Sequence, residues 1–449
     1  MEKAGDRVQR LNAAPFRTGA RYVLYWAQVN RRVSFNHGLA YAAEMANRAG
    51  LPVLFYEGLT FDYPHASERF HTFIRQGVPD TQAELERLGI GYVFYQRQGP
   101  DDPNDSLYRV AKEAAAVVTD AYPLFPAKRY NASVPGKLDI PYYAVDSSCI
   151  VPMSGFDKRE YAAYTMRPKV KRLLPMYLER VPPIRVRNKF RGFIPEFPAG
   201  VAGVDPSVPP SPVYQGGARA AHRRLRHFLK NSLHRYANLS NQPSENATSG
   251  LSLYLHFGHI SSLEVALVVQ DYAREHNLIA DEFLEELIVR RELAFNFARF
   301  TENPESLENL PNWARATLAT HARDKRDPVY TADQFERALT HDALWNAAQR
   351  ELLITGKIHG YYRMYWGKKI LEWSATPEEA LATAVYLNDR YALDGRDPAS
   401  YANILWCFGL HDRPWAERPI FGQVRYMGYE GMRRKTNVDA YVRSIECLR

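Results

Sequence analysis

Cysteine is scarce in this chain, since only Cys149, Cys407 and Cys447 occur among its 449 residues. Three widely spaced thiols exclude a disulfide-stapled scaffold and form no zinc-binding pattern, so we expect no metal site and a reducing compartment. Long apolar runs are also lacking, because none approaches the roughly 18 residues of a membrane-spanning helix. The first residues, MEKAGDRVQRLN, contain no apolar stretch typical of a secretory signal. These absences predict a cytoplasmic protein that has no membrane partner.

The standard glycine-rich phosphate loops are missing, because neither GxGxxG nor GxxxxGK(S/T) occurs. Charge of one sign is only mildly in excess: 58 Lys and Arg residues against 50 Asp and Glu residues give a net charge of +8. This excess is compatible with a polyanionic partner, but it equally suits plain solubility. Aromatic residues, by contrast, reach 13%, which suits stacking on flat ligands as well as ordinary cores.

Short apolar segments alternate with helical segments in the first 150 residues. Residues 36–49 have helical composition, and Gly50 stands where a helix-ending glycine belongs. The apolar segments have the length and continuity of strands that are buried on both faces. This alternation predicts an α/β, Rossmann-like domain with a doubly wound parallel sheet, which binds ligands at the carboxyl ends of its strands. The predicted strands are residues 21–26, 51–56, 91–95, 115–119 and 142–145, and a second helix is expected at 81–88.

Residues 181–217 are rich in proline and glycine and predict a long connection with no packed elements of its own. After residue 217 the composition becomes helical, with no strand pair and no internal repeat. The expected organisation is therefore an α/β domain at 1–180, a linker at 181–217 and an all-α domain at 218–449. Helices are predicted at residues 218–237, 262–275, 280–299, 332–339, 343–355, 361–373 and 377–390.

Several stretches of the helical half place polar or aromatic groups in patterns that could carry chemistry. The run from Thr248 to Ser252 could cradle a phosphate, or it could be a helix cap and a loop. Residues 284–292 set five charges among apolar residues, which suits either paired buried groups or the solvated face of an amphipathic helix. Residues 359–373, with Trp345 upstream, could be an aromatic core or a relay of indoles that lose an electron in turn.

Six motifs follow one another in the helical half: LSLYLHFG, FLEELIVRREL, LWNAAQ, GKIHGYYRMYWGKKILEW, YLNDRYALDGRDP and FGQVRYMGYEGMRRKTNVDAY. Together they resemble the class II cyclobutane pyrimidine dimer photolyases of the photolyase–cryptochrome superfamily. The resemblance implies a FAD-dependent, blue-light-driven enzyme that repairs UV-damaged DNA. It also implies an α/β antenna domain joined by a long linker to an all-α FAD-binding domain, the organisation inferred above. An antenna pigment such as a deazaflavin is a further cofactor of such relatives, although no ligand residues can be matched for it.

By position in these motifs, the resemblance implies the contacts of the flavin. Arg363 and Asp394 correspond to the charged pair beside the isoalloxazine, and Asn388 corresponds to the residue that faces flavin N5. An amide there can accept from N5–H or donate to a bare N5, and so stabilise a reduced flavin. The pyrophosphate cradle and the remaining cofactor contacts that the resemblance implies are Tyr236, Thr248, Ser249, Gly250, Leu251, Ser252, Arg291, Gly395 and Asp397.

The resemblance also implies the residues of the reaction. Glu286 corresponds to the glutamate that hydrogen-bonds the dimer, and burial would keep its carboxyl protonated as a donor. Excited reduced flavin would pass an electron to the flipped-out dimer, whose ring bonds break before the electron returns, so the enzyme is a lyase. Trp366, Trp345 and Trp373 correspond to the tryptophans that photoreduce the flavin. The pocket that holds the dimer corresponds to Trp406, Trp415, Tyr361 and Met364, and DNA phosphates would be held by Arg425, Arg433, Arg434 and Lys435.

The chain departs from the family pattern at four places, one of which is Ala399-Ser400 after the GRDP motif, where an Asn or Ser and then a glycine are expected. Ser240 stands where an arginine that reaches the substrate is expected, and Phe295 stands where an aspartate is expected. The loop between Trp406 and His411 is one residue short. We expect these changes to lie on the substrate side more than on the flavin side. Two alternatives to dimer repair therefore stay open, a blue-light sensor of cryptochrome type and a flavoenzyme that acts on another substrate, and in each case a monomer is expected.

Overall fold

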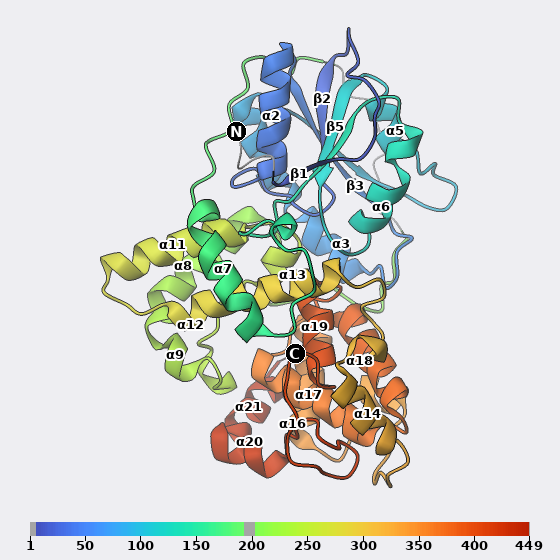
Figure 1. Cartoon of the computed structure of the whole chain (residues 1–449), viewed down its shortest axis with the longest axis vertical. Helices are drawn as coiled ribbons and strands as arrows, with labels where there is room; N and C mark the ends of the chain where they lie inside the picture. The colour runs from blue at the N-terminus through green and yellow to red at the C-terminus, as the bar shows by residue number, and fades with distance from the viewer. Residues whose placement is uncertain (1–5, 193–202, 449) are drawn as a thin grey trace.

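The computed structural model describes residues 6–192 and 203–448. Figure 1 shows a sheet with its flanking helices at one end of the molecule and a larger group of helices at the other. No helix in these two described ranges is long and apolar enough to cross a membrane. The predicted order, an α/β half followed by an all-α half, is confirmed.

The sheet has six strands in the order β1-β6-β5-β2-β3-β4. Five of the strands run parallel to one another, as predicted, and the central ones are buried from end to end. The prediction is wrong at one edge, where β1 (Val8–Arg10) pairs with β6 in the antiparallel direction. This strand has three residues and is mostly exposed, so it leaves no apolar run in the sequence. The parallel strands are β2 (Tyr22–Trp26), β3 (Val53–Leu59), β4 (Gly91–Gln96), β5 (Ala114–Asp120) and β6 (Tyr142–Val145).

Helices cover both faces of the sheet, as a doubly wound architecture requires. Val23 and Tyr25 of β2 point to one face and Leu24 points to the other, because side chains alternate along a strand. The helix against the first face begins after Asn36, whose side chain accepts from a backbone N–H of the first turn, and ends at Gly50, which has a φ of 67°. The first face packs α2 (His37–Ala49) and α4 (Val78–Leu88), and the second packs α5 (Ser106–Ala111) and α6 (Ala127–Ser133).

The second half is built from helices around two apolar cores. Its helices are α8 (Ala218–Asn231), α9 (Tyr236–Leu239), α10 (Ser252–His256), α11 (Ser262–Glu275), α12 (Asp281–Leu284), α13 (Arg291–Arg299), α14 (Asn312–Thr320), α15 (Ala332–Glu336), α16 (Ala343–Thr355), α17 (Gly360–Trp373), α18 (Pro377–Tyr391), α19 (Pro398–Trp406), α20 (Tyr429–Lys435) and α21 (Val438–Glu446). One core lies among α13 and α16–α19 and contains the buried indoles of Trp345 and Trp366. The other lies among α8 and α11–α13, and it also takes in α3 (Glu68–Arg75) and α7 (Ala163–Tyr177).

The border between the two halves is packed differently from what the sequence predicts. Although α7 precedes residue 180, it packs into a core of the helical half. Of the predicted linker, residues 181–192 and 203–217 form no helix or strand, and residues 193–202 lie outside the described ranges. The described parts are nevertheless packed, because the Pro209 carbonyl accepts from Arg69 Nε at 2.9 Å. The domain boundaries themselves stay a prediction.

Buried hydrogen bonds tie the two halves together. The Glu292 carboxyl group of α13 accepts from the backbone N–H groups of Ile150 (2.6 Å) and Val151 (3.1 Å). Burial raises the pKa of Glu292 to about 8, although these two N–H partners act in the opposite direction. The Arg69 guanidinium donates to the Leu352 carbonyl at 3.1 Å. These contacts fix the helical half against the edge of the sheet where parallel strands end.

Candidate functional site

The charged stretch at 284–292 is interrupted by a π-helical turn. The sequence predicts one helix over 280–299, whereas the structure has α12, a π turn at Glu285–Arg290 and then α13. A π turn adds a residue to the helix and is frequent at functional sites. Glu286 lies in this turn as an exposed residue, yet desolvation by neighbouring protein atoms raises the pKa of its carboxyl group, although Arg290 acts against this. The shift is toward the protonated form, which is the form of a carboxyl group that can donate a hydrogen bond.

The surroundings of this turn are aromatic and positively charged. The Arg290 guanidinium lies 5.4 Å from the ring centre of Trp406 and 3.7 Å from the carboxylate of Glu285. The Trp406 indole N–H is buried and has no hydrogen-bond partner in the described ranges. Burial, and then the charge of Glu286, raises the pKa of Tyr236. Arg290, which the sequence reasoning did not single out, thus acts by its charge on the predicted acid and lies beside the ring of the predicted stacking residue.

The other residues predicted for the substrate pocket have different surroundings. The Trp415 side chain is 39% exposed, and the guanidinium groups of Arg413 and Arg425 each lie 5.1 Å from its ring centre. Tyr361 and Met364 lie on α17 and pack, partly buried, on an apolar core. An exposed indole between two cations suits contact with a nucleic acid, through stacking on bases and through charge.

A buried carboxylate and two cations form a second polar cluster in the helical half. Asp394 accepts from Arg363 Nη2 at 2.8 Å, from Lys357 Nζ at 3.2 Å and from the Ser252 hydroxyl at 2.6 Å. Burial by itself raises the pKa of Asp394, but the two cations outweigh it and hold this pKa far below the ordinary value. The structure thus joins the predicted charged pair to the end of the predicted phosphate cradle. Lys357 was missed, although it stands in the same motif as Arg363.

Buried polar atoms beside this cluster are left for a ligand. Arg363 Nε and His359 Nε2 are buried, and neither has a hydrogen-bond partner in the parts of the chain that the structure describes. Burial, assisted by the charges of Lys357 and Arg363, lowers the pKa of His359 to about 4, so its imidazole is neutral. Because buried donors and acceptors are normally paired, these atoms fit a polar ring such as that of a flavin.

The predicted phosphate cradle is a turn that a basic side chain holds in place. Arg224 donates to the carbonyls of Ser249 (2.7 Å) and Thr248 (3.2 Å). Gly250 has a φ of 64°, and a Cβ atom there would lie 2.7 Å from Arg224 Nε, so a larger residue would disturb the turn. The Leu251 side chain belongs to an apolar core, and its backbone N–H donates to the Ser249 hydroxyl at 3.4 Å. The turn therefore fits an anion that is bound by hydroxyl and backbone groups.

Asn388 is oriented by the residue that follows it. Its buried amide Nδ2 donates to Asp389 Oδ1 at 3.0 Å. Asp389 in turn accepts from the Tyr401 hydroxyl (2.7 Å) and from the Arg396 backbone N–H (3.1 Å). Because a carboxylate only accepts, the amide nitrogen must face Asp389, and the amide oxygen is left for a donor such as a flavin N5–H.

Three further residues predicted to bind the cofactor, Arg291, Asp397 and Gly395, have contacts within the chain, and their binding of the cofactor stays a prediction. Arg291 Nη1 donates to the Ser148 carbonyl at 2.7 Å. Asp397 accepts from the Tyr122 hydroxyl at 3.0 Å. At Gly395 a Cβ atom would lie 2.7 Å from the carbonyl oxygen of Asn388, so glycine permits a close approach of two backbone segments. The contacts of Arg291 and Asp397 are with the first half of the chain.

Phe295 and Ser240, two of the departures from the family pattern, lie in different surroundings. Phe295 is fully buried, and its ring lies 5.5 Å from that of Tyr122 in an edge-on arrangement. Phe295 therefore packs between the two halves, and its place on the substrate side stays a prediction. Ser240 donates its backbone N–H to the Tyr236 carbonyl at 2.9 Å. Ser240 thus ends α9, and its place on the substrate side stays a prediction.

Three tryptophans of α16 and α17 form a continuous line of buried rings. The ring centres of Trp366 and Trp345 are 6.4 Å apart with an interplanar angle of 4°, and those of Trp345 and Trp373 are also 6.4 Å apart, with an angle of 66°. The Trp345 indole N–H donates to the Trp366 carbonyl at 3.0 Å, and the Trp366 indole N–H donates to Gln349 Oε1 at 2.9 Å. The structure thus brings the three predicted relay residues together at distances that suit transfer of an electron from ring to ring.

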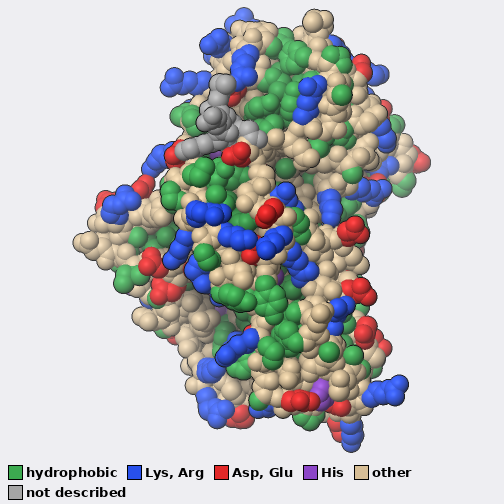
Figure 2. Space-filling model, in the orientation of Figure 1, with side chains coloured by type: hydrophobic (Ala, Val, Ile, Leu, Met, Phe, Trp, Pro, Cys, Tyr) green, Lys and Arg blue, Asp and Glu red, His purple; other side chains and the backbone are tan. Residues whose placement is uncertain are grey.

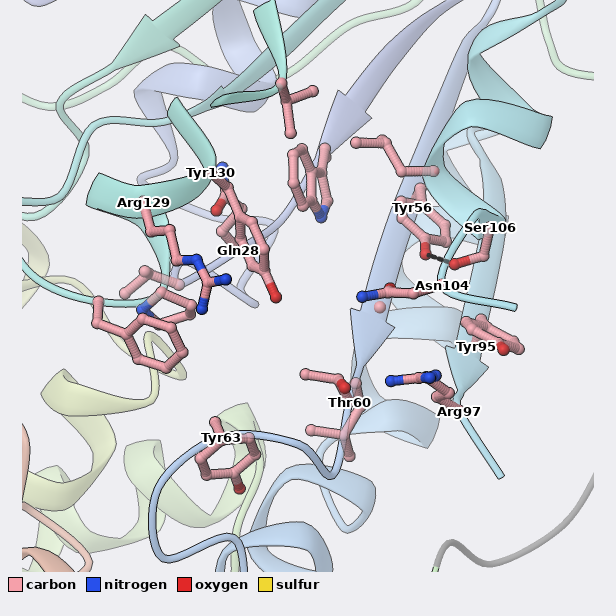
Figure 3. Close-up of a pocket in the computed structure, with 18 of the residues that line it drawn as sticks. Gln28, Tyr56, Thr60, Tyr63, Tyr95, Arg97, Asn104, Ser106, Arg129 and Tyr130 are labelled. Atoms are coloured by element: carbon pink, nitrogen blue, oxygen red, sulfur yellow. Dashed lines mark hydrogen bonds between the residues drawn. The ribbon is translucent and has the colours of Figure 1, made fainter. Parts of the chain in front are cut away.

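A separate cavity of about 370 Å³ lies where the parallel strands end. Figure 3 shows Arg129 and Tyr130 on one side of this cavity and Tyr56 and Arg97 on the other. This is the edge at which the sequence predicts a ligand for a doubly wound sheet. Its rings and guanidinium groups suit a flat, negatively charged molecule. The helical half contributes His256, Phe257 and Arg396 to the lining.

Comparison with known proteins adds a family to these features. The family model of DNA photolyase matches residues 23–186. The deoxyribodipyrimidine photo-lyase of Methanothermobacter thermautotrophicus is 42% identical over 99% of this chain and 98% of its own length. This chain belongs to the DNA photolyase family. Two further photolyases, named deoxyribodipyrimidine photo-lyase, are those of Arabidopsis thaliana (36% identical, 95% of this chain and 89% of that protein) and Potorous tridactylus (37% identical, 94% and 81%).

Solved structures share the photolyase fold at low sequence identity. The cryptochrome of Synechocystis sp. PCC6803 has a TM-score of 0.75 at 16% identity, over 96% of this chain and 89% of that one. The archaeal photolyase of Sulfolobus tokodaii has a TM-score of 0.66 at 15% identity, over 94% of this chain and 89% of that one. Both halves of the photolyase chain are therefore covered by one known architecture.

Proposed function

We propose that this photolyase is a class II enzyme that repairs cyclobutane pyrimidine dimers in UV-damaged DNA by light-driven electron transfer from FAD. The observation that carries the proposal is the exposed Glu286 carboxyl group in its π turn, whose pKa is raised, with the Arg290 guanidinium 5.4 Å from the ring centre of Trp406. A flipped-out dimer needs a donor for a pyrimidine carbonyl and a ring on which its bases stack. Curated relatives at 36–42% identity that are named deoxyribodipyrimidine photo-lyase support the same reaction. A light sensor or another flavoenzyme would need neither group.

The Asp394 cluster and the turn before it would hold the flavin. When bound, FAD supplies the light absorption and the one-electron chemistry of the reaction. Arg363 and Asp394 would hold the ring, because Arg363 Nε and neighbouring buried atoms have no partner among the described residues. The Thr248–Ser252 turn would hold the pyrophosphate through hydroxyl and backbone N–H groups. Asn388 would offer its amide oxygen, since its nitrogen is already engaged by Asp389.

Positively charged side chains would hold the DNA backbone around the dimer. Figure 2 shows Lys and Arg side chains gathered over the middle of one face, in the region where Figure 1 draws α7 and α13. Arg413 and Arg425, which flank the exposed Trp415, suit the same partner. Phosphate contacts of this kind release counterions, so the affinity for DNA falls as salt rises. The exposed residues Arg433, Arg434 and Lys435 of α20 are further candidates for such contacts.

Repair of a defined substrate tests this proposal. Protein whose flavin has been reduced chemically should restore a dimer-containing oligonucleotide under blue light and should leave it unchanged in the dark. Undamaged DNA of the same sequence is the binding control and should bind more weakly. Flavin-loaded, illuminated protein that leaves the dimers intact would contradict the proposal, and equal affinity for the two DNAs would favour the sensor or another substrate.

We further propose that the cavity at the strand ends holds an antenna chromophore such as a deazaflavin. Tyr56 and Tyr130 offer aromatic surface, and Arg97 and Arg129 offer positive charge for an anionic group. The Sulfolobus tokodaii photolyase was solved with two FAD molecules, which supports a second chromophore in this fold. Protein reconstituted with a deazaflavin should show an absorption band in addition to that of FAD. The Arg129→Ala variant should lose that band and keep the flavin, and a wild-type spectrum of FAD alone would contradict the proposal.

We also propose that the protein acts as a monomer in the cytoplasm, with its α/β domain at 1–180, its linker at 181–217 and its FAD domain at 218–449. Support comes from the arrangement of the proposed sites, because every residue assigned to the flavin, the dimer and the antenna pigment belongs to one chain. Size-exclusion chromatography with light scattering should give the mass of one chain, and a stable dimer would contradict the monomer.

A further inference from the structure

The exposed Trp415 stands on a loop between α19 and α20, residues 411–425, that is closed by its own backbone. The Trp415 N–H donates to the Gln423 carbonyl at 2.8 Å, and Arg418 and Gly422 exchange two backbone hydrogen bonds, of 2.9 and 2.8 Å. The Phe421 side chain is buried in an apolar core. This segment, the Trp415 loop, is therefore a compact turn that presents its indole to the solvent.

The Trp415 loop rests on α14 and on the turn that follows this helix. The Thr317 hydroxyl of α14 accepts from the Gln423 backbone N–H at 2.9 Å, and Asp324 Oδ2 accepts from the Ile420 backbone N–H at 2.7 Å. Gly422 has a φ of 51°, and a Cβ atom there would lie 1.9 Å from Thr317 Oγ1, so glycine permits the close approach of the loop. The position of the loop thus depends on polar groups of another element.

A histidine between two carboxylates joins this turn to the loop. His321 Nδ1 lies 2.6 Å from Asp324 Oδ2, and His321 Nε2 lies 2.9 Å from Glu417 Oε1 of the loop. Because a carboxylate only accepts, both ring nitrogens donate at once only in the imidazolium form. The His321 side chain is 14% exposed, whereas that of Glu417 is 62% exposed. The protonated ring therefore ties an exposed part of the loop to a sheltered position.

Several features favour the charged form of His321. It directly follows the last residue of α14, and a cation is stabilised at the C-terminus of a helix. The hydrogen bond of Asp324, and then that of Glu417, raises the pKa of His321, although desolvation acts against them. Asp324 and Glu417 are the charged groups that face the imidazole among the described residues. Arg326 acts on Asp324 from the same turn, and Thr317, the α14 side chain that meets the loop, does not titrate.

We propose that His321, as an imidazolium, is the positioning residue that holds the Trp415 loop against α14 in the form that binds DNA. The inference rests on the proposed function, because it takes Trp415, Arg413 and Arg425 as contacts of the nucleic acid. Loss of the proton leaves the imidazole one hydrogen for two carboxylates, so one of its two ties is lost. It also leaves the Glu417 carboxylate without a counter-ion beside groups that contact phosphates. Both effects weaken DNA binding as pH rises through the pKa of His321, and by linkage DNA binding takes up protons.

His222 provides a matched control. Its Nε2 lies 2.7 Å from Glu264 Oε1, and its Nδ1 lies 2.8 Å from the Ala218 carbonyl. The hydrogen bond of Glu264 raises the pKa of His222, as the carboxylates do for His321. This pair joins α8 to α11, which pack on a different apolar core from Phe421 of the Trp415 loop. A titrating histidine beside a carboxylate is thus common to both places, whereas the contact with the loop belongs to His321.

DNA binding by flavin-loaded protein in the dark tests the inference, with fluorescence anisotropy of a labelled, dimer-containing duplex from about pH 6 to about pH 9 at constant ionic strength. Wild-type affinity should fall by about fivefold over this range, as expected for the loss of one partly exposed ion pair. His321→Gln should bind about fivefold more weakly at the acidic end and should lose the fall, whereas His222→Gln should follow the wild type. Calorimetry in two buffers should show proton uptake on binding by the wild type and by His222→Gln but not by His321→Gln.

Two further measurements keep the test independent of any folding defect in His321→Gln. Glu417→Gln changes an exposed side chain, and it should flatten the pH profile and bind more tightly than the wild type at the alkaline end, because the unneutralised carboxylate is gone. Hydrogen exchange followed by mass spectrometry at one acidic pH should show faster exchange of the loop amides in His321→Gln and the wild-type rate in His222→Gln.

The outcomes separate the inference from the proposed function. Wild-type protein that prefers dimer-containing DNA but binds it equally at every pH overturns the inference alone, as does a His321→Gln variant whose affinity falls as steeply as that of the wild type. Loop amides that exchange at the wild-type rate in His321→Gln also overturn it. Protein that binds damaged and undamaged DNA equally contradicts the proposed function, and a pH-dependent affinity that His321→Gln abolishes supports the inference even there.

Discussion

Asp394 and Glu286 are both carboxyl groups of the helical half, Asp394 buried and Glu286 exposed, and their surroundings drive their ionisation in opposite directions. Asp394 has one cation at 2.8 Å and another at 3.2 Å, and its pKa is held low in spite of burial. Glu286 has the charge of Arg290 nearby, but desolvation by the surrounding protein atoms prevails and its pKa is raised. The number and closeness of cations therefore decide between a permanent anion, suited to anchoring a cofactor cluster, and an acid that can donate a proton to a substrate.

Removal of the Asp394 charge should have the largest effect. Asp394→Asn leaves the cations of Arg363 and Lys357 buried without their counter-ion, and breaking such a group typically costs about 3–5 kcal/mol. We expect a corresponding fall in the free energy of unfolding in urea, together with loss of bound flavin on gel filtration. The matched control is Asp271→Asn, because Asp271 pairs with Arg180 where both side chains are largely exposed. The control should cost no more than about 1 kcal/mol, and an equally small loss for Asp394→Asn would contradict the contrast.

Lys357→Met should weaken the same cluster without abolishing it. Asp394 keeps Arg363, so we expect a loss of about 1.5–3 kcal/mol, the usual worth of one hydrogen bond to a charged group. The pKa of Asp394 should also rise toward its ordinary value. Because a depressed pKa stabilises the fold above the ordinary value and this stability is lost as pH falls through the folded pKa, acid unfolding should begin at a higher pH. Unfolding curves that coincide with those of the wild type at every acidic pH would show that Lys357 does not support Asp394.

Local sequence signals were sufficient for the elements that are buried or capped in a simple way. The parallel strands are continuous apolar runs, and Gly50 ends its helix in the left-handed conformation that its position predicts. Strand β1 was not predicted from the sequence, because it is short and mostly exposed and only its pairing with β6 defines it. The π turn was not predicted from the sequence, because residues 280–299 have ordinary helical composition and the extra residue reflects tertiary packing.

The candidate site was predictable only in part, because its contacts join distant residues. The motifs suggested Asp394 and Arg363, but Ser252 lies 142 positions from Asp394 and meets it only in the folded chain. The placement of Phe295 between the halves likewise depends on Tyr122, which no pattern around residue 295 reveals. Sequence thus supplied the types of residue, and the packing supplied their partners.

Truncation of Glu286 should slow repair without releasing the flavin. Glu286→Ala removes the proton donor from the π turn, and we expect repair by chemically reduced, illuminated protein to slow by about tenfold, equivalent to ~1.4 kcal/mol in the barrier. Flavin content, measured from the absorption spectrum, should match that of the wild type, because Glu286 lies in a different cluster from Asp394. Wild-type repair rates in this variant would remove Glu286 from the reaction.

The conservative variant Glu286→Gln should have the smallest effect and should show what the proton does. Its amide still donates but never ionises, so we expect a loss of about threefold, or ~0.6 kcal/mol. The wild-type acid has a raised pKa, so its donor form is complete below that pKa and disappears as pH rises through it. Repair by the wild type should therefore decline with rising pH, whereas repair by Glu286→Gln should stay level, and at high pH the wild-type rate should fall below that of the variant, because an ionised carboxylate no longer donates. Parallel pH profiles would mean that Glu286 orients the dimer by shape alone, and the contrast with Asp394 would then concern position and not ionisation.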